Sequence, residues 1–268
     1  MRIISLVPSH TEILFALGLG QQIAGVTVHC DYPAQALSKP RMGTFADPDV
    51  AGIISTQPDL VLAGGTIHKS CTEELRRAGL RVFVFEPQTV GELFIGIEKL
   101  VQHTQAGKAG IQALDNLKSE LQQIKEKALK HPRPKVVFVM GNRKLMTPGP
   151  ASCQYDALQL AGASLMPFVE EISYVPIAWS DVSSYDPDII LSCGRSPEEP
   201  PRKRCPGCNL AFRPCDRDAA SIMENPLLAQ VPAVKARRVH TIPCHFLCRT
   251  GPRLLKGMKK LVALFNAD

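Results

Sequence analysis

Residues 57–65 read Gln-Pro-Asp-Leu-Val-Leu-Ala-Gly-Gly, and residues 186–194 read Asp-Pro-Asp-Ile-Ile-Leu-Ser-Cys-Gly. In each stretch a Pro-Asp pair precedes an aliphatic run that opens into glycine, which predicts a turn followed by a short buried strand. Asp188 follows Asp59 by 129 residues. The similarity of the two stretches indicates that the chain contains two related halves, each built around such a strand.

Short apolar runs alternate with helical patterns through both halves. In the first half we expect strands over residues 3–7, 23–28, 60–63 and 81–85, with helices over residues 11–17 and 72–78. In the second half we expect strands over residues 135–140, 164–168, 188–192 and 238–242. Alternation of strands and helices is typical of an α/β lobe with a parallel sheet flanked by helices, so two such lobes are predicted.

A long amphipathic helix is expected between the lobes. Its apolar positions recur at steps of three and four and end before two prolines: Ile111, Leu114, Leu117, Leu121, Ile124 and Ala128. A helix of about 20 residues is close to 30 Å long. The predicted organisation is an N-terminal lobe (1–105), a bridging helix (106–132) and a C-terminal lobe (133–268) with an insertion at 195–217. A rigid helical bridge predicts little closure of the lobes on a ligand.

The composition indicates a folded soluble chain. Of its 268 residues 45% are hydrophobic and 21% charged, which argues against disorder. No apolar run approaches the roughly 18 residues of a membrane span, and Met1 leads directly into a strand-like segment without a signal peptide. We therefore expect a cytoplasmic protein without membrane insertion, or a periplasmic one if the chain is a mature form.

Positive charge is concentrated near the C-terminus, within a formal net charge of +6. Residues 235–260 hold eight Lys or Arg residues and no acidic residue. Such a stretch can bind nucleic acid, but no aromatic-interleaved RNA motif accompanies it. We interpret it as a solvated helix face with one or two arginines that contact a ligand, and expect no nucleic-acid partner.

A series of motifs runs through nearly the whole chain. Residues 2–14 read Arg-Ile-Ile-Ser-Leu-Val-Pro-Ser-His-Thr-Glu-Ile-Leu, followed by Cys-Asp-Tyr-Pro at 30–33, Gly-Thr-Phe at 43–45 and Arg-Thr-Gly-Pro-Arg at 249–253. The series resembles the vitamin B12 and iron-complex binding proteins of ABC importers. The resemblance implies two α/β lobes joined by a helix, with a ligand held in a cleft between them. It also implies a binding protein and not an enzyme.

The resemblance assigns ligand-contacting positions. His29 and Phe45 stand at aromatic positions of the first lobe, Trp179 lies near one in the second, and His245 and Arg249 occupy the final loop of the cleft. A corrinoid or iron chelate is a wide, largely apolar disc with polar edges, which such side chains can contact. Packing in the core is the alternative for each aromatic side chain.

His10 has two interpretations. It follows the first strand, and an imidazole there could ligate the cobalt or iron of a bound complex. It could equally cap the helix that begins near Thr11. We include His10 among the candidate ligand-binding residues.

Two positions depart from importer-bound relatives. The resemblance implies one glutamate on each lobe that docks on arginines of a membrane transporter, whereas Ala51 and Tyr185 stand at these positions. This departure suggests a protein that stores, delivers or senses its ligand, with an ABC transporter as a possible partner only.

Cysteines give a second candidate site. The insertion carries Cys205-Pro-Gly-Cys208 and Cys215, and Cys244 and Cys248 flank a histidine further on. A Cys-x-x-Cys turn can bring two thiolates onto one metal ion. We predict that these five cysteines supply a zinc site or an iron-sulfur cluster, close to the place where Cys193 ends its strand. Cys71 and Cys153 are expected to be small buried residues, and Cys30 is left open.

Two function classes remain open. The first is a soluble binding protein for a corrinoid or metal chelate with an added cysteine-ligated centre. The second is an iron-sulfur electron-transfer or reductive-activation protein that acts on a bound cofactor. Hydrolase motifs such as Gly-x-Ser-x-Gly and His-Glu-x-x-His are absent from the sequence.

Overall fold

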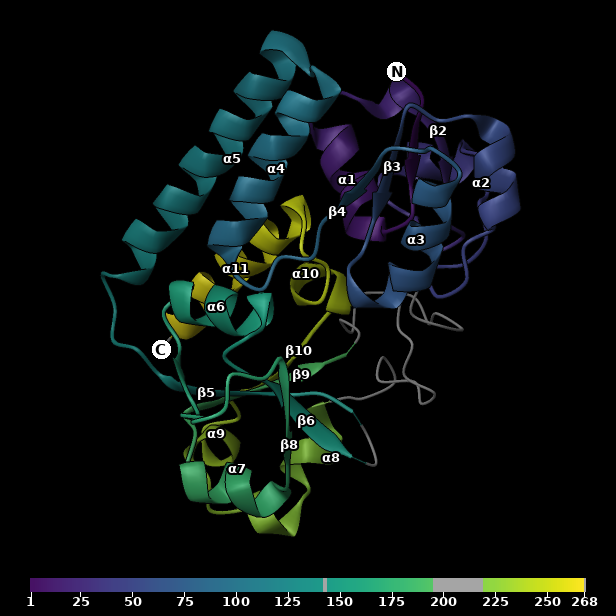
Figure 1. Ribbon diagram of the computed structural model, residues 1–268. Coiled ribbons are helices and arrows are strands. Elements are labelled where there is room, and N and C mark those ends of the chain that lie inside the picture. The colour runs from purple at the N-terminus through teal and green to yellow at the C-terminus, as the bar shows by residue number, and fades with distance from the viewer. Residues whose placement is uncertain (142–143, 195–218, 268) are drawn as a thin grey trace. The chain divides into compact units, whose positions relative to one another are not determined.

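The computed structural model describes residues 1–141, 144–194 and 219–267. The chain forms two compact units (Figure 1). Unit 1 contains Met1–Pro87 and Gly91–Ser119, and unit 2 contains Gln88–Val90 and the chain from Glu120 onward.

Unit 1 is built on a four-stranded sheet. Its strands are β1 (Ile3–Ser5), β2 (Ile23–Val26), β3 (Leu60–Ala63) and β4 (Val82–Val84), in the order β2-β1-β3-β4. All neighbouring strands are parallel. The helices of this part of the chain are α1 (Pro8–Ala16), α2 (Val50–Thr56), α3 (Lys69–Arg77), α4 (Val90–Thr104) and α5 (Gly107–Ala128). Short 3-10 helices, η1 (Gly20–Gln22), η2 (Ala34–Ser38) and η3 (Thr66–His68), lie in the loops.

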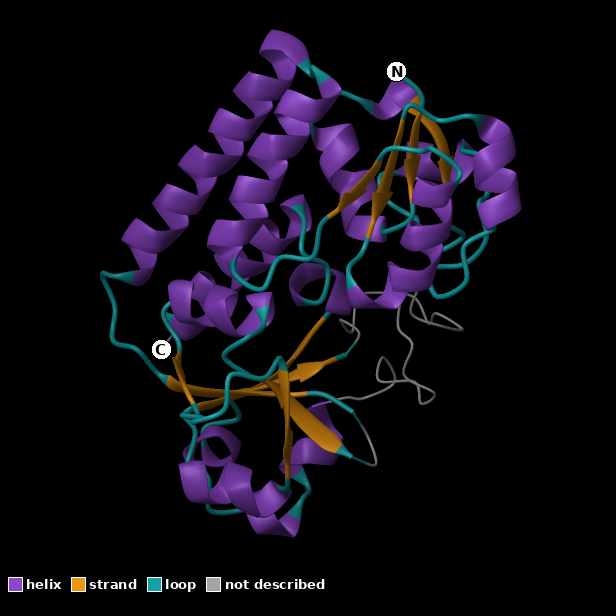
Figure 2. Cartoon of the chain, in the orientation of Figure 1, coloured by secondary structure: helices purple, strands orange, loops and turns teal. Residues whose placement is uncertain are grey.

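Unit 2 contains a second parallel four-stranded sheet and a small hairpin-like sheet. The large sheet has the order β10-β9-β5-β7 and consists of β5 (Lys135–Val139), β7 (Ser164–Leu165), β9 (Ile189–Cys193) and β10 (Val239–Ile242). The antiparallel pair is β6 (Leu145–Pro148) with β8 (Tyr174–Ile177). The helices are α6 (Cys153–Leu160), α7 (Trp179–Tyr185), α8 (Ala219–Met223), α9 (Pro232–Lys235), α10 (Cys244–Leu247) and α11 (Pro252–Phe265), with η5 (Pro226–Leu228). Figure 2 separates these helices from the strands by colour.

The two large sheets have the same topology. In each, the first strand along the chain lies inside the sheet, the second lies on one side of it, and the third and fourth lie in succession on the other. Parallel strands of this kind need helical crossovers, which the intervening helices supply. The prediction of two related α/β halves with parallel sheets flanked by helices is confirmed.

The repeated Pro-Asp stretches have the same backbone conformation and the same contact. The helix before each stretch ends at a residue in the left-handed region, Gln57 with φ 47° or Asp186 with φ 56°. The aspartate two residues later accepts a hydrogen bond from the first strand: Asp59 from the Arg2 N–H at 2.6 Å, and Asp188 from the Lys135 N–H at 2.7 Å. The repeat is therefore a structural joint between two neighbouring strands.

The eight expected strands are all present, and most are shorter than predicted. The sequence analysis did not predict the β6–β8 pair or helix α4. Strand β8 has an alternating exposed and half-buried pattern over only four residues, which is too short for periodicity to distinguish from a loop. The helix expected over 111–128 is confirmed as part of α5, which passes from unit 1 into unit 2 at residues 119–120.

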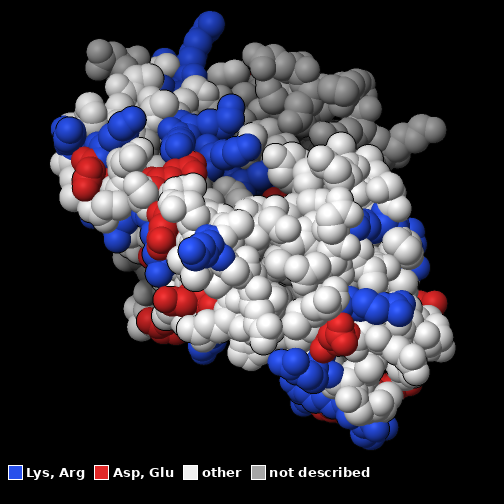
Figure 3. Space-filling view, turned by 90° about the horizontal axis from the view of Figure 1, so that it is seen from above, with Lys and Arg blue, Asp and Glu red and all other residues white. Residues whose placement is uncertain are grey.

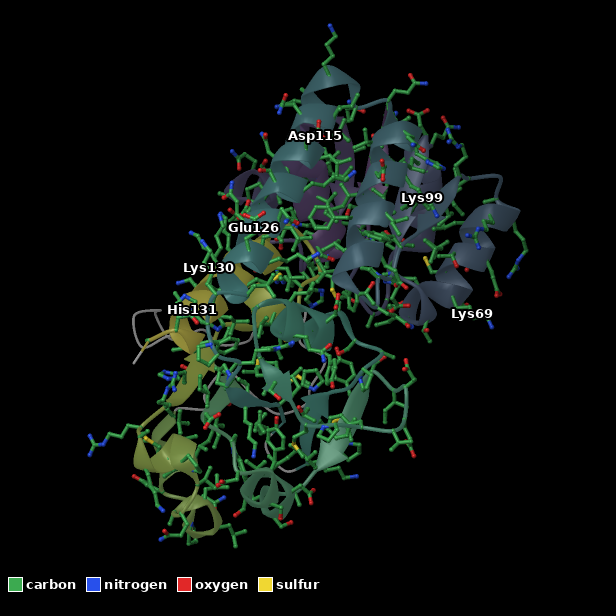
Figure 4. The ribbon with its side chains drawn as sticks, turned by 90° about the vertical axis from the view of Figure 1, so that its left-hand side faces the viewer. Lys69, Lys99, Asp115, Glu126, Lys130 and His131 are labelled. Atoms are coloured by element: carbon green, nitrogen blue, oxygen red, sulfur yellow. The ribbon has the colours of Figure 1, made fainter. Side chains whose placement is uncertain are left out.

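One residue of the expected apolar stripe on α5 is exposed. Ile111 is 52% exposed, whereas Leu114 and Ile124 are 5% and 2% exposed. Asp115 and Glu126 lie on the exposed side of the helix (Figure 4). The prediction was wrong for Ile111 because a helix of 22 residues drifts relative to a strict three-four repeat.

Each unit has an aliphatic core under its sheet. In unit 1 it includes Ile4, Leu6, Val61 and Ile53. In unit 2 it includes ten buried residues from the strands and the surrounding helices, among them Val137, Ile190 and Leu228. The strand residues of β1, β3 and β9 are buried on both faces, as expected for parallel strands covered by helices.

Charged side chains of both signs lie on the surface. The face in Figure 3 carries small groups of Lys and Arg beside Asp and Glu, with uncharged surface between them. Among the described residues, no helix is long and apolar enough to cross a membrane.

Candidate functional site

The carboxyl ends of parallel strands are the usual ligand-binding edge of an α/β sheet. In unit 1 this edge is formed by the loops that follow β1, β2, β3 and β4. Three histidines and Phe45 lie in or beside these loops: His10, His29 and His68. The predicted ligand residues of unit 1 therefore belong to one edge of one sheet.

The backbone of Phe45 contacts one histidine through its N–H and another through its carbonyl oxygen. Its N–H donates to His29 Nδ1 at 3.0 Å, and its carbonyl oxygen lies 2.6 Å from His68 Nε2. The Phe45 ring also meets the His68 ring edge-on, with 5.3 Å between centroids and 71° between planes. The structure thus brings together the predicted residues His29 and Phe45, and adds His68, which the sequence analysis did not single out.

The protonation state of His68 follows from its contacts. Its Nδ1 accepts the Gly64 N–H at 2.8 Å, so in the neutral ring Nε2 carries the hydrogen and donates to the Phe45 carbonyl. The side chain is fully buried. Burial lowers the pKa of His68, an effect that the backbone bond to Phe45 and the charge of Glu86 partly oppose.

Two glycines allow this arrangement. A Cβ atom on Gly64 would lie 3.3 Å from His68 Nδ1, and one on Gly65 would collide with the Glu86 carboxylate. That carboxylate accepts the Thr66 N–H at 3.0 Å. The Gly-Gly pair at the end of β3, followed by a histidine, is the sequence signal that could have identified His68.

His10 is buried in helix α1. It is 2% exposed and stacks on Phe85, with 5.3 Å between ring centroids and 26° between planes. Among the described residues, its Nδ1 has no hydrogen-bond partner. Burial lowers the pKa of His10 to about 3, with a smaller opposing effect of a backbone bond to Phe85, so the imidazole is neutral at physiological pH. Contact of His10 with a ligand stays a prediction.

A buried polar network lies beside His29. The Thr11 hydroxyl donates to Ser5 Oγ at 2.8 Å and contacts Cys30 Sγ at 3.2 Å, and Thr27 Oγ1 lies 3.3 Å from the same sulfur. Cys30 is fully buried. This settles the position of Cys30: its thiol joins β1, α1 and the loop after β2, which fixes the backbone that carries His29.

In unit 2, Trp179 is the first residue of α7. Its half-buried side chain packs against the aliphatic core of the unit. This packing supports the interpretation of Trp179 as a core residue. Contact of Trp179 with a ligand stays a prediction.

The loop after β10 carries the other predicted residues of unit 2. His245 is half-buried in α10, with its ring centroid 4.3 Å from that of Phe246. Arg249 and Arg253 are each only 9% exposed. Two arginines of the basic C-terminal stretch are thus buried, whereas Lys256, Lys259 and Lys260 of the same stretch are exposed.

Three thiols meet where β9 and β10 end. Cys193 pairs with Ile242 at the last position of the ladder, and Cys244 and Cys248 bracket α10, with the Cys248 N–H donating to the Cys244 carbonyl at 2.7 Å. The Cys193 thiol is hydrogen-bonded to the thiols of both Cys244 and Cys248, and these bonds together with burial raise its pKa well above the usual value. The six cysteines in the described part of the chain are all thiols.

Only part of the predicted metal site lies among the described residues. Cys205, Cys208 and Cys215 lie outside the described residues. Among the residues that are described, no group of three or more His, Cys, Asp or Glu side chains is arranged to hold a metal ion. The cysteine-ligated centre therefore stays a prediction.

The two positions expected to dock on a transporter lie on equivalent helices. Ala51 is exposed on α2, the helix before β3, and Tyr185 ends α7, the helix before β9. Tyr185 is half-buried, and its hydroxyl donates to the Ser164 carbonyl at 3.0 Å. Neither side chain is acidic.

The chain thus consists of two α/β units whose parallel sheets have matching topology. The model of the periplasmic binding protein family matches residues 3–244, so the chain belongs to this family. By its membership in this family the chain is a binding protein.

Individual relatives and solved structures are similar to this chain over most of their length. The chain is 28% identical over 275 residues to an uncharacterized ABC transporter substrate-binding lipoprotein, YvrC, of Bacillus subtilis, covering 100% of this chain and 80% of the relative. The structure matches the periplasmic heme-binding protein HutB of Vibrio cholerae with a TM-score of 0.81 and 23% identity, over 100% of this chain and 99% of that one. It matches the periplasmic vitamin B12 binding protein BtuF of Vibrio cholerae with a TM-score of 0.79 and 21% identity, over 98% and 96%.

Proposed function

We propose that this protein binds a corrinoid, a heme or a related iron chelate, and that Phe45 contacts the ligand's apolar face. The observation that carries the proposal is the Phe45 peptide held between His29 and His68 at the carboxyl edge of the first sheet. A protein that contacts a wide flat ligand needs aromatic surface whose orientation is fixed before binding.

The relatives support this ligand class. Proteins that bind vitamin B12 or heme share the fold along nearly the full length of the chain. Both kinds of ligand are planar metal macrocycles with polar groups at the edge. In the proposal, His29 meets a polar edge group, and Arg249 provides a guanidinium for an anionic one. Roles of His10, Trp179 and His245 at the ligand belong to the same proposal.

The cysteine-ligated centre is a separate part of the proposal. The hydrogen-bonded thiols of Cys193, Cys244 and Cys248 favour a thiophilic metal at this edge of unit 2. Since the described residues alone do not hold a metal, the centre needs ligands from the insertion, such as Cys205 and Cys208. Zinc is one candidate occupant, and an iron-sulfur cluster is the other.

An iron-sulfur electron-transfer protein is the alternative function, and the same thiol group is the observation that favours it. Protein purified without oxygen would be brown, with visible absorption that bleaches on reduction, if a cluster is present. Colourless protein with one bound zinc per chain would exclude the electron-transfer function and keep the structural centre. Replacing Cys244 and Cys248 by serine should release either occupant.

The partner in this proposal is the small-molecule ligand. The proposal does not require docking on an ABC importer. The positions of the implied docking glutamates hold Ala51 and Tyr185, which favours a carrier or sensor over an importer component. The described cysteines are thiols, which is typical of a reducing compartment.

Trp179 provides the test of ligand binding. It is the single tryptophan of the chain, and both heme and corrinoids quench tryptophan emission by energy transfer. Titration with hemin and with cyanocobalamin should give saturable quenching at one equivalent for at least one of them. Phe45→Leu should weaken that binding at least tenfold, whereas Phe83→Leu, which changes a half-buried phenylalanine on β4, should leave it within about threefold. Equal affinity of all three proteins would overturn the role of Phe45.

A further inference from the structure

His68 is a buried histidine with both ring nitrogens engaged. One nitrogen accepts from Gly64 at the end of β3 (2.8 Å), and the other donates to the Phe45 carbonyl (2.6 Å). The ring therefore connects the central part of the sheet to the loop that contains Phe45. An apolar residue of similar size could fill the same space but could make neither bond.

The Phe45 loop has further supports on its other sides. Thr44 N–H donates to the Asp47 carbonyl at 2.9 Å, and Gly43 bridges Pro48. These bonds close the turn that contains Phe45 but do not attach it to β3. The attachment of this turn to the end of β3 runs through His68.

We propose that His68 is a positioning residue of the ligand site: it fixes the Phe45 peptide against the end of β3 and so holds the Phe45 ring in the orientation that meets the ligand. The inference rests on the proposed function for the identity of the ligand. Its geometric part, the restraint of Phe45 by His68, concerns the free protein and is tested without ligand.

The restraint depends on a neutral imidazole. A protonated His68 carries a hydrogen on Nδ1 and can no longer accept from Gly64, so the ring turns away from one of its two partners. The titratable groups that face it are Glu86 after β4, His10 on α1 and, across the Phe45 peptide, His29. Since burial lowers the pKa of His68, the restraint is complete at neutral pH and is lost only at acidic pH.

Two substitutions separate hydrogen bonding from space filling. Gln can supply one donor and one acceptor, so His68→Gln retains the means to hold Phe45. His68→Leu fills the space without either bond. His240→Gln, at a partly buried histidine on β10, is the matched control in the other unit.

The first readout uses the free protein with 4-fluorophenylalanine placed at position 45. Wild type and His68→Gln should each give one narrow fluorine resonance, and His68→Leu should give a broadened or split one. On acidification the wild-type resonance should change reversibly, while that of His68→Gln should not follow the same titration. A narrow, unshifted resonance in His68→Leu would overturn the inference, whatever the ligand is.

The second readout is affinity for hemin and cyanocobalamin. His68→Leu should lose at least tenfold in affinity, His68→Gln less than about threefold, and His240→Gln should match wild type. In a Phe45→Ala background, His68→Leu should cause no further loss, because His68 acts through Phe45. A full additional loss in that background would show that His68 acts by another route and overturn the inference. If Phe45→Ala binds as tightly as wild type, the proposed ligand site fails, and the fluorine spectrum alone then decides the role of His68.

Discussion

At the scale of single residues, unit 1 contains two buried imidazoles, on α1 and η3, whose environments oppose protonation. His10 stacks on Phe85 and has its pKa lowered to about 3 by burial. His68 has its pKa lowered by the same cause. Unfolding exposes both rings, and the unfolded chain then binds protons more readily than the folded one.

The first prediction concerns the pH dependence of stability. A histidine with a lowered folded pKa contributes stability that is fully present above the unfolded value of about 6.5 and is lost as pH falls toward the folded value. For His10 this window runs from about 6.5 to about 3. His10→Leu should therefore remove about 3 kcal/mol of the fall in unfolding free energy between pH 7.5 and pH 4.5. Urea unfolding at several pH values measures this.

The comparison needs wild type and variant in the same buffers, because carboxylates also titrate in this range. Only the difference between the two curves belongs to His10. If the unfolding free energies of wild type and His10→Leu fall with the same slope below pH 6.5, the assignment of a neutral buried His10 is contradicted.

The second prediction concerns thiol reactivity in unit 2. Cys193 is 5% exposed and its pKa is raised by hydrogen bonds to Cys244 and Cys248, whereas Cys248 is exposed. Because the thiolate is the reactive form, iodoacetamide at pH 8 should label Cys248 of the metal-free protein at least tenfold faster than Cys193. Peptide mass spectrometry over a time course gives both rates. Labelling of Cys193 first would contradict the described thiol arrangement.

At the candidate site, some of the residues could be predicted from the sequence and others could not. His29 and Phe45 were expected at the ligand from the family resemblance, and they are hydrogen-bonded neighbours. His68 was not expected: the Gly64-Gly65 pair before it marks the end of a strand, but the two bonds that give His68 its importance are made across the fold. The choice between core and ligand for Trp179 depended on packing that periodicity does not report.

At the scale of elements, the repeated joint between neighbouring strands is the most predictable feature. Each copy combines a left-handed helix end, a proline and an aspartate that accepts a backbone N–H of the adjacent strand. Local sequence specifies such a joint because proline restricts the turn and aspartate supplies the acceptor. Strand ends and the first turn of α5 were less predictable, because tertiary contacts decide where pairing and burial stop.

The third prediction tests the two joints. Asp59→Ala and Asp188→Ala should each lower the free energy of unfolding by about 1 kcal/mol, because each removes one partly solvated hydrogen bond to a backbone N–H. Asp115→Ala, on the exposed side of α5, should change it by less than about 0.5 kcal/mol. Chemical denaturation of the three variants gives the comparison. Equal, negligible effects at all three positions would show that the repeated aspartates are not structural.

At the scale of the whole molecule, the duplicated topology and the family match lead to the same class of protein. Both large sheets place their third and fourth strands in succession beside the first, and the family model extends over residues 3–244. The order of strands in a sheet follows from the alternation of strands and helices and from the internal repeat, so this level could be inferred from sequence. The ligand could be narrowed only to a class, because related sites are distinguished by a few side chains at the sheet edges.

The central claim is that the protein binds a planar metal macrocycle, and calorimetric titration of the wild-type protein tests it most directly. Hemin, cyanocobalamin and a ferric siderophore should be titrated separately at pH 7.5. We expect hemin or cyanocobalamin to bind at one equivalent with a Kd of about 1 μM or tighter. Absence of saturable binding for both macrocycles, in protein that unfolds cooperatively, would contradict the claim.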